Sequence, residues 1–206
     1  MYRIVKRGFD IISSLLLFIA ISPIFLVIAI LVRIKLGSPV FFRQERTGMK
    51  MKRFNIIKFR TMTNDTDIDG NPLPDEKRQT PFGKFLRSSS LDELPELLNI
   101  IKGDMSVIGP RSLPPSYDEY YLEEEKDRFL VRGGLIPPDS VEQSPYITWD
   151  RQFQYEADYG KNLSFQKDLN VFLSIFRMLY NRDKSDYGEY VRKPLNVERA
   201  NMKQSV

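Results

Sequence analysis

Two adjacent carboxylates, Asp92 and Glu93, are the residues of this sequence best suited to chemistry. The chain contains no cysteine and no histidine, which excludes cysteine and serine–histidine nucleophiles and Cys/His zinc sites. Chemistry must therefore come from carboxylates, lysine, arginine, hydroxyls, backbone amides or a hard metal ion. Neighbouring carboxylates can hold magnesium, and one of them can attack phosphorus. Lys84, Arg87 and Arg111 are the cations expected to neutralise the phosphate oxygens.

A helix is expected to position this pair. Apolar residues recur at helical spacing over residues 94–101, and Gly103 is a good helix stop. Ser90 and Glu93 match a capping box, which predicts that Asp92 and Glu93 lie at the helix N-terminus. Two interpretations are open at this point. The carboxylates cap the helix and favour its dipole, or the free N–H groups of that N-terminus bind a phosphate beside them.

A basic stretch over residues 33–60 favours a phosphate-bearing partner. The net charge of the chain is only +4, but this stretch carries nine lysines and arginines against one acid, Glu45. Such a segment attracts the phosphate of a nucleotide, a nucleic acid or a lipid headgroup.

The same stretch is rich in β-forming residues. The runs at 39–44 and 53–62, with Gly48 in the turn-like segment between them, predict a short β-hairpin. Alternation would place Lys58 and Arg60 on one face of the second strand. They are then either a phosphate clamp or two solvated charges on an exposed strand.

The segment Ile11–Val32 contains no charged residue and is long enough for a helix to cross a bilayer. Pro23 near its middle removes a backbone donor and tends to kink a helix, and Ser22 beside it can cap the freed backbone groups. Both flanks are basic, whereas a crossing helix usually shows a bias to one side. The residues alone leave a re-entrant, helix-break-helix anchor and a single-pass anchor equally open.

The C-terminal part predicts one helix and a tail. Six aromatic and leucine side chains fall on one helical face, for which core packing is expected and a membrane interface is the alternative. They are Phe165, Leu169, Phe172, Leu173, Phe176 and Tyr180. After Asn181 the chain turns polar and charged, which predicts a surface tail.

Five blocks of the sequence resemble the bacterial sugar transferases, also called monotopic phosphoglycosyl transferases. The Ser22–Pro23 break is similar too, and the resemblance covers roughly residues 1–180. The blocks are FRQERTG (42–48), KFRTMT (58–63), GNPLPDEKR (70–78), LRSSSLDELPEL (86–97) and IIKGDMSVIGPR (100–111).

The resemblance implies an activity, a cofactor and a location. The family transfers a phospho-sugar from a UDP-sugar to undecaprenyl phosphate, giving undecaprenyl diphosphate-sugar and UMP, by a ping-pong route that uses magnesium. The anchor is implied to be re-entrant, with the catalytic domain on the cytoplasmic face of the bacterial inner membrane. The chain should then divide into an anchor (1–36), a catalytic domain (37–180) and a polar tail (181–206), mainly α with one small hairpin.

The resemblance also assigns roles to residues. Asp92 matches the attacking carboxylate, and Glu93 matches its neighbour, which places the metal or the nucleophile. The expected metal ligands are Asp92 and Glu93. The positions expected to bind the phosphates or nucleotide are Lys58, Arg60, Arg87, Arg111 and Arg132.

The sequence departs from the family pattern in three places, namely Ser112, the block 132–146 and Glu156, and the altered block lies outside the Asp-Glu core. Ser112 stands where a proline is common, and Gly133 also replaces a proline. Ser144 falls where a second arginine usually stands, and Glu156 matches a carboxylate one methylene shorter. We interpret Ser144 and Glu156 as determinants of sugar selectivity; the alternative is impaired catalysis.

Three functional hypotheses follow. The first is a phosphoglycosyl transferase, and the second is a catalytically weak relative that serves as a membrane scaffold for downstream glycosyltransferases. The third, a membrane-tethered nucleic-acid binder, is disfavoured because the sequence has no helix-turn-helix or aromatic-basic RNA motif. The oligomeric state is left open, with a homodimer as one candidate.

Overall fold

The computed structural model describes residues 1–142, 147–181 and 192–200, without the side chains of 178–181. The chain divides into two compact units. Unit 1 comprises Met1–Asp10, Glu45–Phe54 and Gly103–Val206, and unit 2 comprises Ile11–Gln44 and Asn55–Lys102. The first helix and the first two strands each contribute to both units. The predicted boundaries at residues 36 and 180 concern placement at a membrane and stay predictions.

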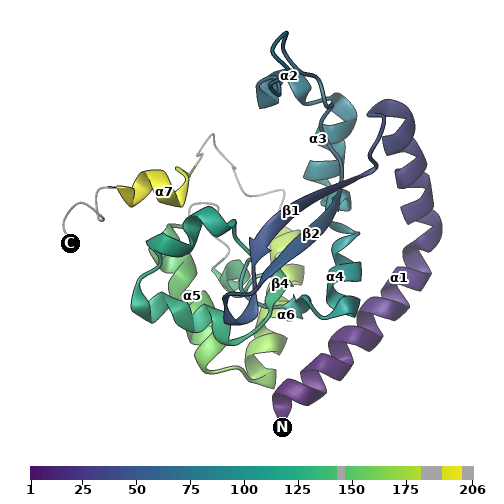
Figure 1. Ribbon diagram of the computed structural model, residues 1–206. Helices are drawn as coiled ribbons and strands as arrows, with labels where there is room; N and C mark the ends of the chain where they lie inside the picture. Colours follow the sequence, from purple (N-terminus) through teal and green to yellow (C-terminus); the bar gives the residue numbers. More distant parts are fainter. Residues whose placement is uncertain (143–146, 182–191, 201–206) are drawn as a thin grey trace. The chain divides into compact units, whose positions relative to one another are not determined.

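Helix α1 (Tyr2–Lys35) is drawn as one long helix in Figure 1, with Pro23 inside it. Among the described residues, α1 is the one helix that is long and apolar enough to cross a membrane. The rest of the chain buries little of its apolar stretch. Pro23 has no N–H to donate to the carbonyl of Ile19, and the Ser22 hydroxyl donates to that carbonyl at 2.8 Å instead. The hydrogen bond expected of Ser22 is present, whereas its role in a break of the helix and the re-entrant path stay predictions.

Strands β1 (Phe41–Thr47) and β2 (Arg53–Phe59) form a two-stranded antiparallel sheet, which confirms the predicted hairpin (Figure 1). A short 3-10 turn, η1 (Met49–Met51), joins them. The hairpin forms because the aromatic and β-branched residues of both runs favour extended backbone. Arg60 lies one residue beyond β2, so the strand ends between the two cations that were expected to share its face.

Unit 2 packs its helices around the end of the hairpin. They are α2 (Asp75–Arg78), α3 (Pro81–Ser88), η2 (Leu91–Glu93) and α4 (Glu96–Lys102). Phe59 of β2 and Leu86 of α3 are buried in one apolar cluster with Val32 of α1 and with Leu36, the residue that follows this helix. Removing these side chains from water stabilises the unit by roughly 1.5–3 kcal/mol each.

Gly83 lets α3 lie directly on the chain that follows β2. A Cβ at this position would meet the carbonyl oxygen of Thr61 at 1.8 Å, so only glycine fits. Thr80 caps the helix by accepting a hydrogen bond from the Gly83 N–H at 3.0 Å. These two contacts fix where α3 starts and how closely it approaches the strand end.

Unit 1 is built on a parallel strand pair that the sequence pattern did not predict. Strands β3 (Met105–Ile108) and β4 (Gly133–Ile136) pair with Met105 opposite Gly133 and Ile108 opposite Ile136. The connection and the helices after it are η3 (Pro115–Tyr120), η4 (Glu123–Leu130), η5 (Pro138–Val141), α5 (Trp149–Lys161), α6 (Phe165–Asn181) and α7 (Leu195–Glu198). The prediction of a mainly helical protein with a small hairpin is confirmed, with this second sheet added.

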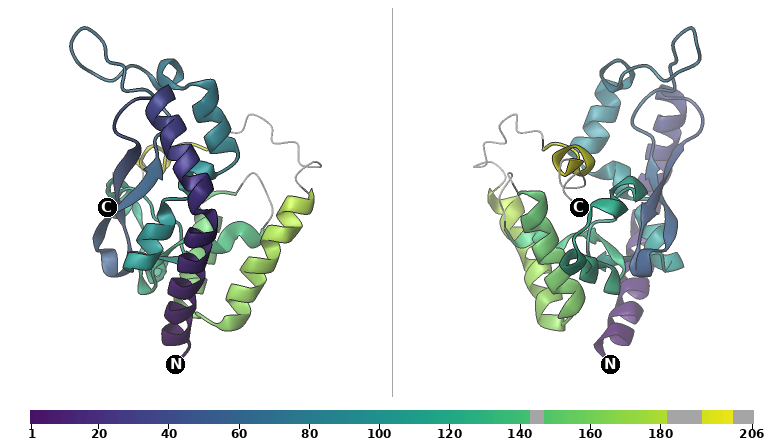
Figure 2. Two further views of the ribbon diagram at one scale, coloured as in Figure 1. Left: turned by 90° about the vertical axis from the view of Figure 1, so that its right-hand side faces the viewer. Right: turned by 60° about the vertical axis from the view of Figure 1, so that its left-hand side comes forward.

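Helix α6 differs from the expectation of core packing. Figure 2 shows it along its length, and Phe165, Phe172, Leu173 and Phe176 are exposed, whereas the small neighbour Ser174 is buried. The prediction was wrong because the helix turns its smaller side chains to the core. The alternative, a membrane interface, stays a prediction. The side chain of Tyr180 lies outside the described residues.

The described part of the C-terminal segment, 192–200, also differs from the predicted surface tail. Leu195 is fully buried in the apolar cluster that contains Trp149 and Phe153. Arg199 is buried and pairs with Glu125 at 2.7 Å. A polar composition did not reveal these two anchors, because the leucine is a single apolar residue and the partners of Arg199, Glu125 and Asp150, lie far away in the sequence.

Candidate active site

Lys58 links two carboxylates in unit 2. Its ammonium group lies 2.6 Å from Glu93 Oε1 and 3.1 Å from Glu96 Oε1. Burial lowers the pKa of Lys58, but the charges of Glu96 and then Glu93 outweigh it and leave the pKa raised. Lys58 therefore stays charged, and it holds the last residue of η2 and the first turn of α4 together.

Asp92 lies beside this ion-pair cluster and is 8% exposed. Burial is the main reason why the pKa of the Asp92 carboxyl is raised, and the positive charge of Lys58 opposes it only in part. Glu93 raises this pKa further, and Arg87 lowers it. A carboxylate that has lost much of its hydration is a stronger nucleophile than one in water.

The local backbone at the pair is not the capping box that the sequence predicted. Ser90 adopts a left-handed conformation with φ of 56° and makes no side-chain cap. Glu93 turns to Lys58 instead, and α4 begins only at Glu96. The prediction was wrong because Glu93 forms an ion pair with Lys58 of β2 instead of a local hydrogen bond with the backbone of Ser90. Asp92 and Glu93 thus lie in a 3-10 turn just before the helix.

Arg87 extends from α3 toward the chain after β2. Its Nε donates to Thr61 Oγ1 at 2.9 Å, and its charge acts on Asp92. Gly83 makes this possible, because it lies one turn earlier on α3 and brings that helix against the Thr61 backbone. Arg87 itself is exposed and so accessible to a ligand.

Arg60 is placed differently from the predicted phosphate clamp. Its guanidinium group is buried, with Nη1 donating to the carbonyl of Ser38 at 2.9 Å and Nη2 donating to the carbonyl of Leu36. Arg60 therefore caps the C-terminal end of α1 and does not share a face with Lys58. A cation at the negative end of a helix dipole is stabilising.

The remaining predicted residues lie in unit 1. The Arg111 side chain is exposed, and its backbone N–H donates to Glu156 Oε1 at 2.8 Å. The carboxylate of Glu156 is fully buried and also accepts from Arg128 Nε at 2.9 Å and from Gln152 at 3.0 Å. Arg132 donates from Nε to the carbonyl of Gly103 at 2.8 Å.

Glu156 is therefore enclosed in protein hydrogen bonds and acts on the backbone that carries Arg111. The predicted part of Glu156 in sugar selectivity stays a prediction, and in this environment it would act through the backbone of Arg111. Ser144 lies outside the described residues. The structure thus brings together Lys58, Asp92, Glu93 and Arg87, and it places Arg60 in a structural role.

Comparison with known proteins identifies the family. The model of the bacterial sugar transferase family matches residues 1–182. The chain belongs to the bacterial sugar transferase family.

Among the relatives of this sugar transferase is the uncharacterized sugar transferase EpsL of Bacillus subtilis (strain 168), 42% identical over 82% of this chain and 83% of EpsL. The UDP-glucose:undecaprenyl-phosphate glucose-1-phosphate transferase of Klebsiella pneumoniae is 38% identical over 86% of this chain, which spans only 40% of that relative. The exopolysaccharide production protein ExoY of Sinorhizobium fredii (strain NBRC 101917 / NGR234) is 35% identical over 81% of both chains. The predicted membership in this enzyme family is confirmed.

Two departures of this sugar transferase from the family pattern pack against each other. Gly133 faces Ser112 so closely that a Cβ on residue 133 would meet Ser112 Oγ at 2.0 Å. The Ser112 side chain is buried and fills the space that a larger residue 133 would need. The two changes therefore form one consistent packing arrangement, which argues against damage to the fold.

Sequence reasoning missed three residues that position the predicted site residues. Two of them support the surroundings of Asp92, and one supports Glu156. Glu96 shares Lys58 with Glu93, and its spacing of three from Glu93 was the available signal. Asn99 is buried and binds the backbone of β2 on both sides, accepting from the Ile57 N–H at 3.0 Å and donating to the Asn55 carbonyl at 2.8 Å. Arg128 holds Glu156, and nothing in its local sequence distinguished it from a surface arginine.

The carboxylates around Asp92 fit only one way of binding magnesium, in which the substrate supplies some of the ligands. Within the described residues there is no group of three or more acidic ligands that would form a site made of protein alone. Magnesium, however, is commonly held by one or two carboxylates together with the phosphates of a substrate. Asp92 and Glu93 can supply these carboxylates, so the residues fit an ion that binds together with a diphosphate.

Proposed function

We propose that this sugar transferase moves a sugar phosphate from a UDP-sugar to undecaprenyl phosphate, giving undecaprenyl diphosphate-sugar and UMP. The observation that carries the proposal is the buried carboxylate of Asp92, with a raised pKa, beside the Lys58 cluster. The name of the Klebsiella pneumoniae relative, a UDP-glucose:undecaprenyl-phosphate glucose-1-phosphate transferase, supports the same reaction.

The first step forms a covalent intermediate on Asp92. One oxygen of its carboxylate attacks the sugar-bearing phosphorus of the donor, and the bond from this phosphorus to the bridging oxygen breaks. UMP leaves with the electron pair of that bond. Burial of Asp92 favours this step, because the carboxylate has little hydration to lose before it attacks.

The second step returns the enzyme to its starting state. An oxygen of undecaprenyl phosphate attacks the same phosphorus, and the bond to Asp92 breaks, so the carboxylate is regenerated. An acyl phosphate is reactive enough to pass its group on. No base is needed, because both attacking groups are already anions.

The residues around Asp92 position the carboxylates and neutralise the charge of the phosphates. Lys58 fixes Glu93 and Glu96 and keeps positive charge near Asp92. Arg87 is exposed beside Asp92 and is suited to hold phosphate oxygens of the donor. Magnesium bound by Asp92 and Glu93 would stabilise the charge that spreads over the phosphoryl oxygens.

We also propose that α1 holds the enzyme at the cytoplasmic face of the bacterial inner membrane in a re-entrant path. The exposed apolar surface of α1 and the hydrogen bond from Ser22 at Pro23 support this placement. The acceptor phosphate lies at the bilayer surface, so an anchored enzyme meets it without extracting the lipid. A homodimer and downstream glycosyltransferases are candidate partners.

The decisive experiment is release of UMP in nanodiscs with undecaprenyl phosphate, magnesium and a panel of UDP-sugars. We expect release with one sugar, dependent on magnesium and abolished in Asp92→Asn. Glu123→Gln is the matched control, because it alters an acid of unit 1 whose side chain is 87% exposed and should retain the wild-type rate. Release that persists in Asp92→Asn would rule out Asp92 as the nucleophile.

A second measurement tests the covalent route. Incubation with the UDP-sugar alone, without lipid acceptor, should add the mass of one phospho-sugar to the intact protein, as read by mass spectrometry. A protein that releases UMP only when the acceptor is present would support direct transfer in one step. No release across a broad panel from folded protein would favour the scaffold hypothesis.

A further inference from the structure

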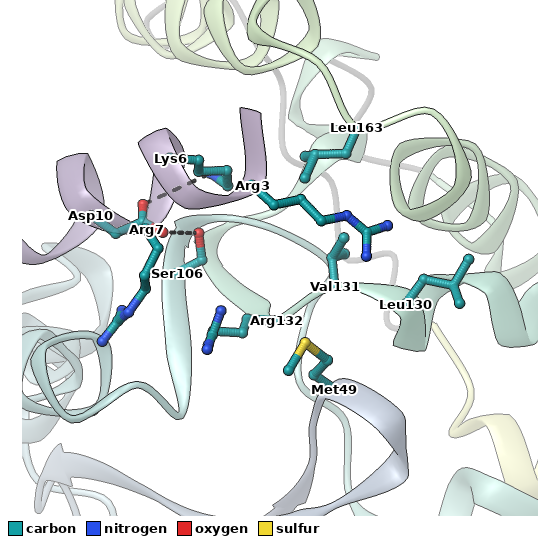
Figure 3. Close-up of a pocket in the computed structure, with 10 residues that line it drawn as sticks. All are labelled: Arg3, Lys6, Arg7, Asp10, Met49, Ser106, Leu130, Val131, Arg132 and Leu163. Atoms are coloured by element: carbon teal, nitrogen blue, oxygen red, sulfur yellow. Dashed lines mark hydrogen bonds and ion pairs between the residues drawn. The ribbon is translucent and has the colours of Figure 1, made fainter. Parts of the chain in front are cut away.

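A basic cavity in unit 1 lies outside the cluster around Asp92. Its volume is about 60 Å³, and its charged lining comes from the first three turns of α1 and from the residue just before β4 (Figure 3). The cations are Arg3, Lys6, Arg7 and Arg132, and the acid is Asp10. Arg3 extends toward Leu130 and Val131, while the guanidinium groups of Arg7 and Arg132 both lie on the other side of the view.

The acids near the cavity are already engaged. Asp10 accepts hydrogen bonds from the Ser106 hydroxyl at 2.7 Å and from the Val107 N–H at 3.2 Å. Lys6 lies 3.0 Å from Asp168 and 3.8 Å from Asp10. Among the described residues that line the cavity, four cations stand against one acid, Asp10, and Asp168 lies beside Lys6, so the lining carries more positive than negative charge.

Two of the cations converge at Gly103. Arg132 donates to its carbonyl at 2.8 Å, and Arg7 Nη2 lies 3.2 Å from the position that a Cβ on Gly103 would take. Burial and then the charge of Arg132 lower the pKa of Arg7. Like charges brought together in this way repel each other, and a multivalent oxyanion between them turns the repulsion into attraction.

The position along the chain indicates where the anion comes from. Arg3, Lys6 and Arg7 immediately precede the charge-free segment Ile11–Val32, so they lie where the chain leaves the apolar layer. Lipid phosphates lie at that same depth. Leu163, which also lines the cavity, stands just before the exposed aromatic face of α6.

We propose that this cavity binds the phosphate group of a membrane lipid between Arg7 and Arg132, with Arg3 at its opening. A phospholipid headgroup and a polyprenyl phosphate both present this chemistry. The inference rests on the proposed placement of α1 in the membrane, but it concerns binding alone and does not rest on the reaction proposed for Asp92.

The test measures thermal unfolding of the full-length protein in an uncharged detergent, without any sugar donor. The added probes are phosphatidylglycerol, undecaprenyl phosphate, zwitterionic phosphatidylcholine and inorganic phosphate, each titrated over the same concentrations. A ligand that binds the folded state raises the unfolding midpoint in a saturable manner. We expect this rise with one or both anionic lipids and little or none with phosphatidylcholine or inorganic phosphate.

The variants Arg7→Gln and Arg132→Gln should each raise the half-saturating lipid concentration about tenfold, the effect of losing one charge-assisted contact. Arg33→Gln is the matched control, because it removes an exposed cation at the opposite end of the apolar segment. Since the readout is the rise caused by lipid, a variant with a lower starting midpoint is still informative. Arg7→Lys should recover part of the response.

The outcomes separate the sources. A response to undecaprenyl phosphate alone would make the cavity the site of the acceptor lipid, and a response to both lipids would make it a general headgroup site. Equal weakening by Arg33→Gln would overturn the proposal, because it would reduce the effect to unspecific attraction. An equal response to inorganic phosphate would overturn the assignment to a lipid.

Discussion

Two buried carboxylates, Asp92 in unit 2 and Glu156 in unit 1, are surrounded in opposite ways. Glu156 accepts hydrogen bonds from Arg128, Gln152 and the backbone of Arg111, so each of its oxygens has protein donors. Asp92 instead has a pKa that is raised mainly by burial, which Lys58 offsets only in part. A carboxylate with a complete set of donors stabilises the fold, whereas one left under-stabilised retains the free energy to react.

The largest expected effect separates activity from stability at Asp92. Asp92→Asn should reduce turnover by at least about a thousandfold, as the loss of a nucleophile does. Because the folded state raises the pKa of Asp92, its charged form is disfavoured by folding at neutral pH. The neutral asparagine removes that cost, so the unfolding midpoint should rise. UMP release measures the first effect, and thermal unfolding measures the second. If both the rate of release and the unfolding midpoint fell, Asp92 would stabilise the fold as Glu156 does, and the proposed difference between them would be wrong.

The second expected effect is a loss of stability at Glu156, the opposite of the gain expected at Asp92. Glu156→Gln leaves Arg128 buried without its anionic partner, which costs about 3–5 kcal/mol of unfolding free energy. Chemical denaturation at neutral pH measures this loss. Glu123→Gln is the control, because it removes a carboxylate of an exposed ion pair with Lys126 and should change little. A stable Glu156→Gln protein with altered sugar preference would support the selectivity hypothesis for this residue.

A smaller effect tests whether the two family departures in unit 1 are coupled. Gly133→Ala should cost about 1–3 kcal/mol, because its Cβ overlaps the hydroxyl of Ser112. Ser112→Ala alone should be nearly neutral, since that hydroxyl is buried without a hydrogen-bond partner. The double variant should recover part of the loss, giving a coupling energy of about 1 kcal/mol in a double-mutant cycle. Strict additivity would show that the two sites are independent.

The smallest effect concerns pH and Asp139. Burial, and then the charge of Glu156, raises the pKa of Asp139 from 3.8 to about 6. The folded state therefore binds this proton more tightly than the unfolded chain does. The penalty is present in full above about pH 6 and disappears as the pH falls toward 3.8.

Asp139→Asn should accordingly stabilise the protein by about 1–2 kcal/mol at pH 7.5 and by almost nothing at pH 4. Denaturation curves of both proteins across this range test the prediction. A difference that does not change with pH would mean that the effect is not due to ionisation of Asp139.

The sequence by itself determined the local elements and indicated the residues that we propose carry the chemistry. The hairpin, the long apolar α1 and the end of α4 at Gly103 follow from β-forming runs, hydropathy and helix signals, which act between near neighbours. The absence of cysteine and histidine already restricted the chemistry to carboxylates and cations. The resemblance of the Asp92 block to the sugar transferases then indicated the family.

Only the tertiary structure decided which charges meet. Lys58 and Arg60 stand two residues apart, yet one joins Glu93 and Glu96 and the other caps α1. The parallel pairing of β3 with β4 and the burial of Glu156 against Arg128 likewise join residues far apart in the chain. Local patterns cannot predict such partners, because the free energy of a buried ion pair depends on what the completed fold removes from water.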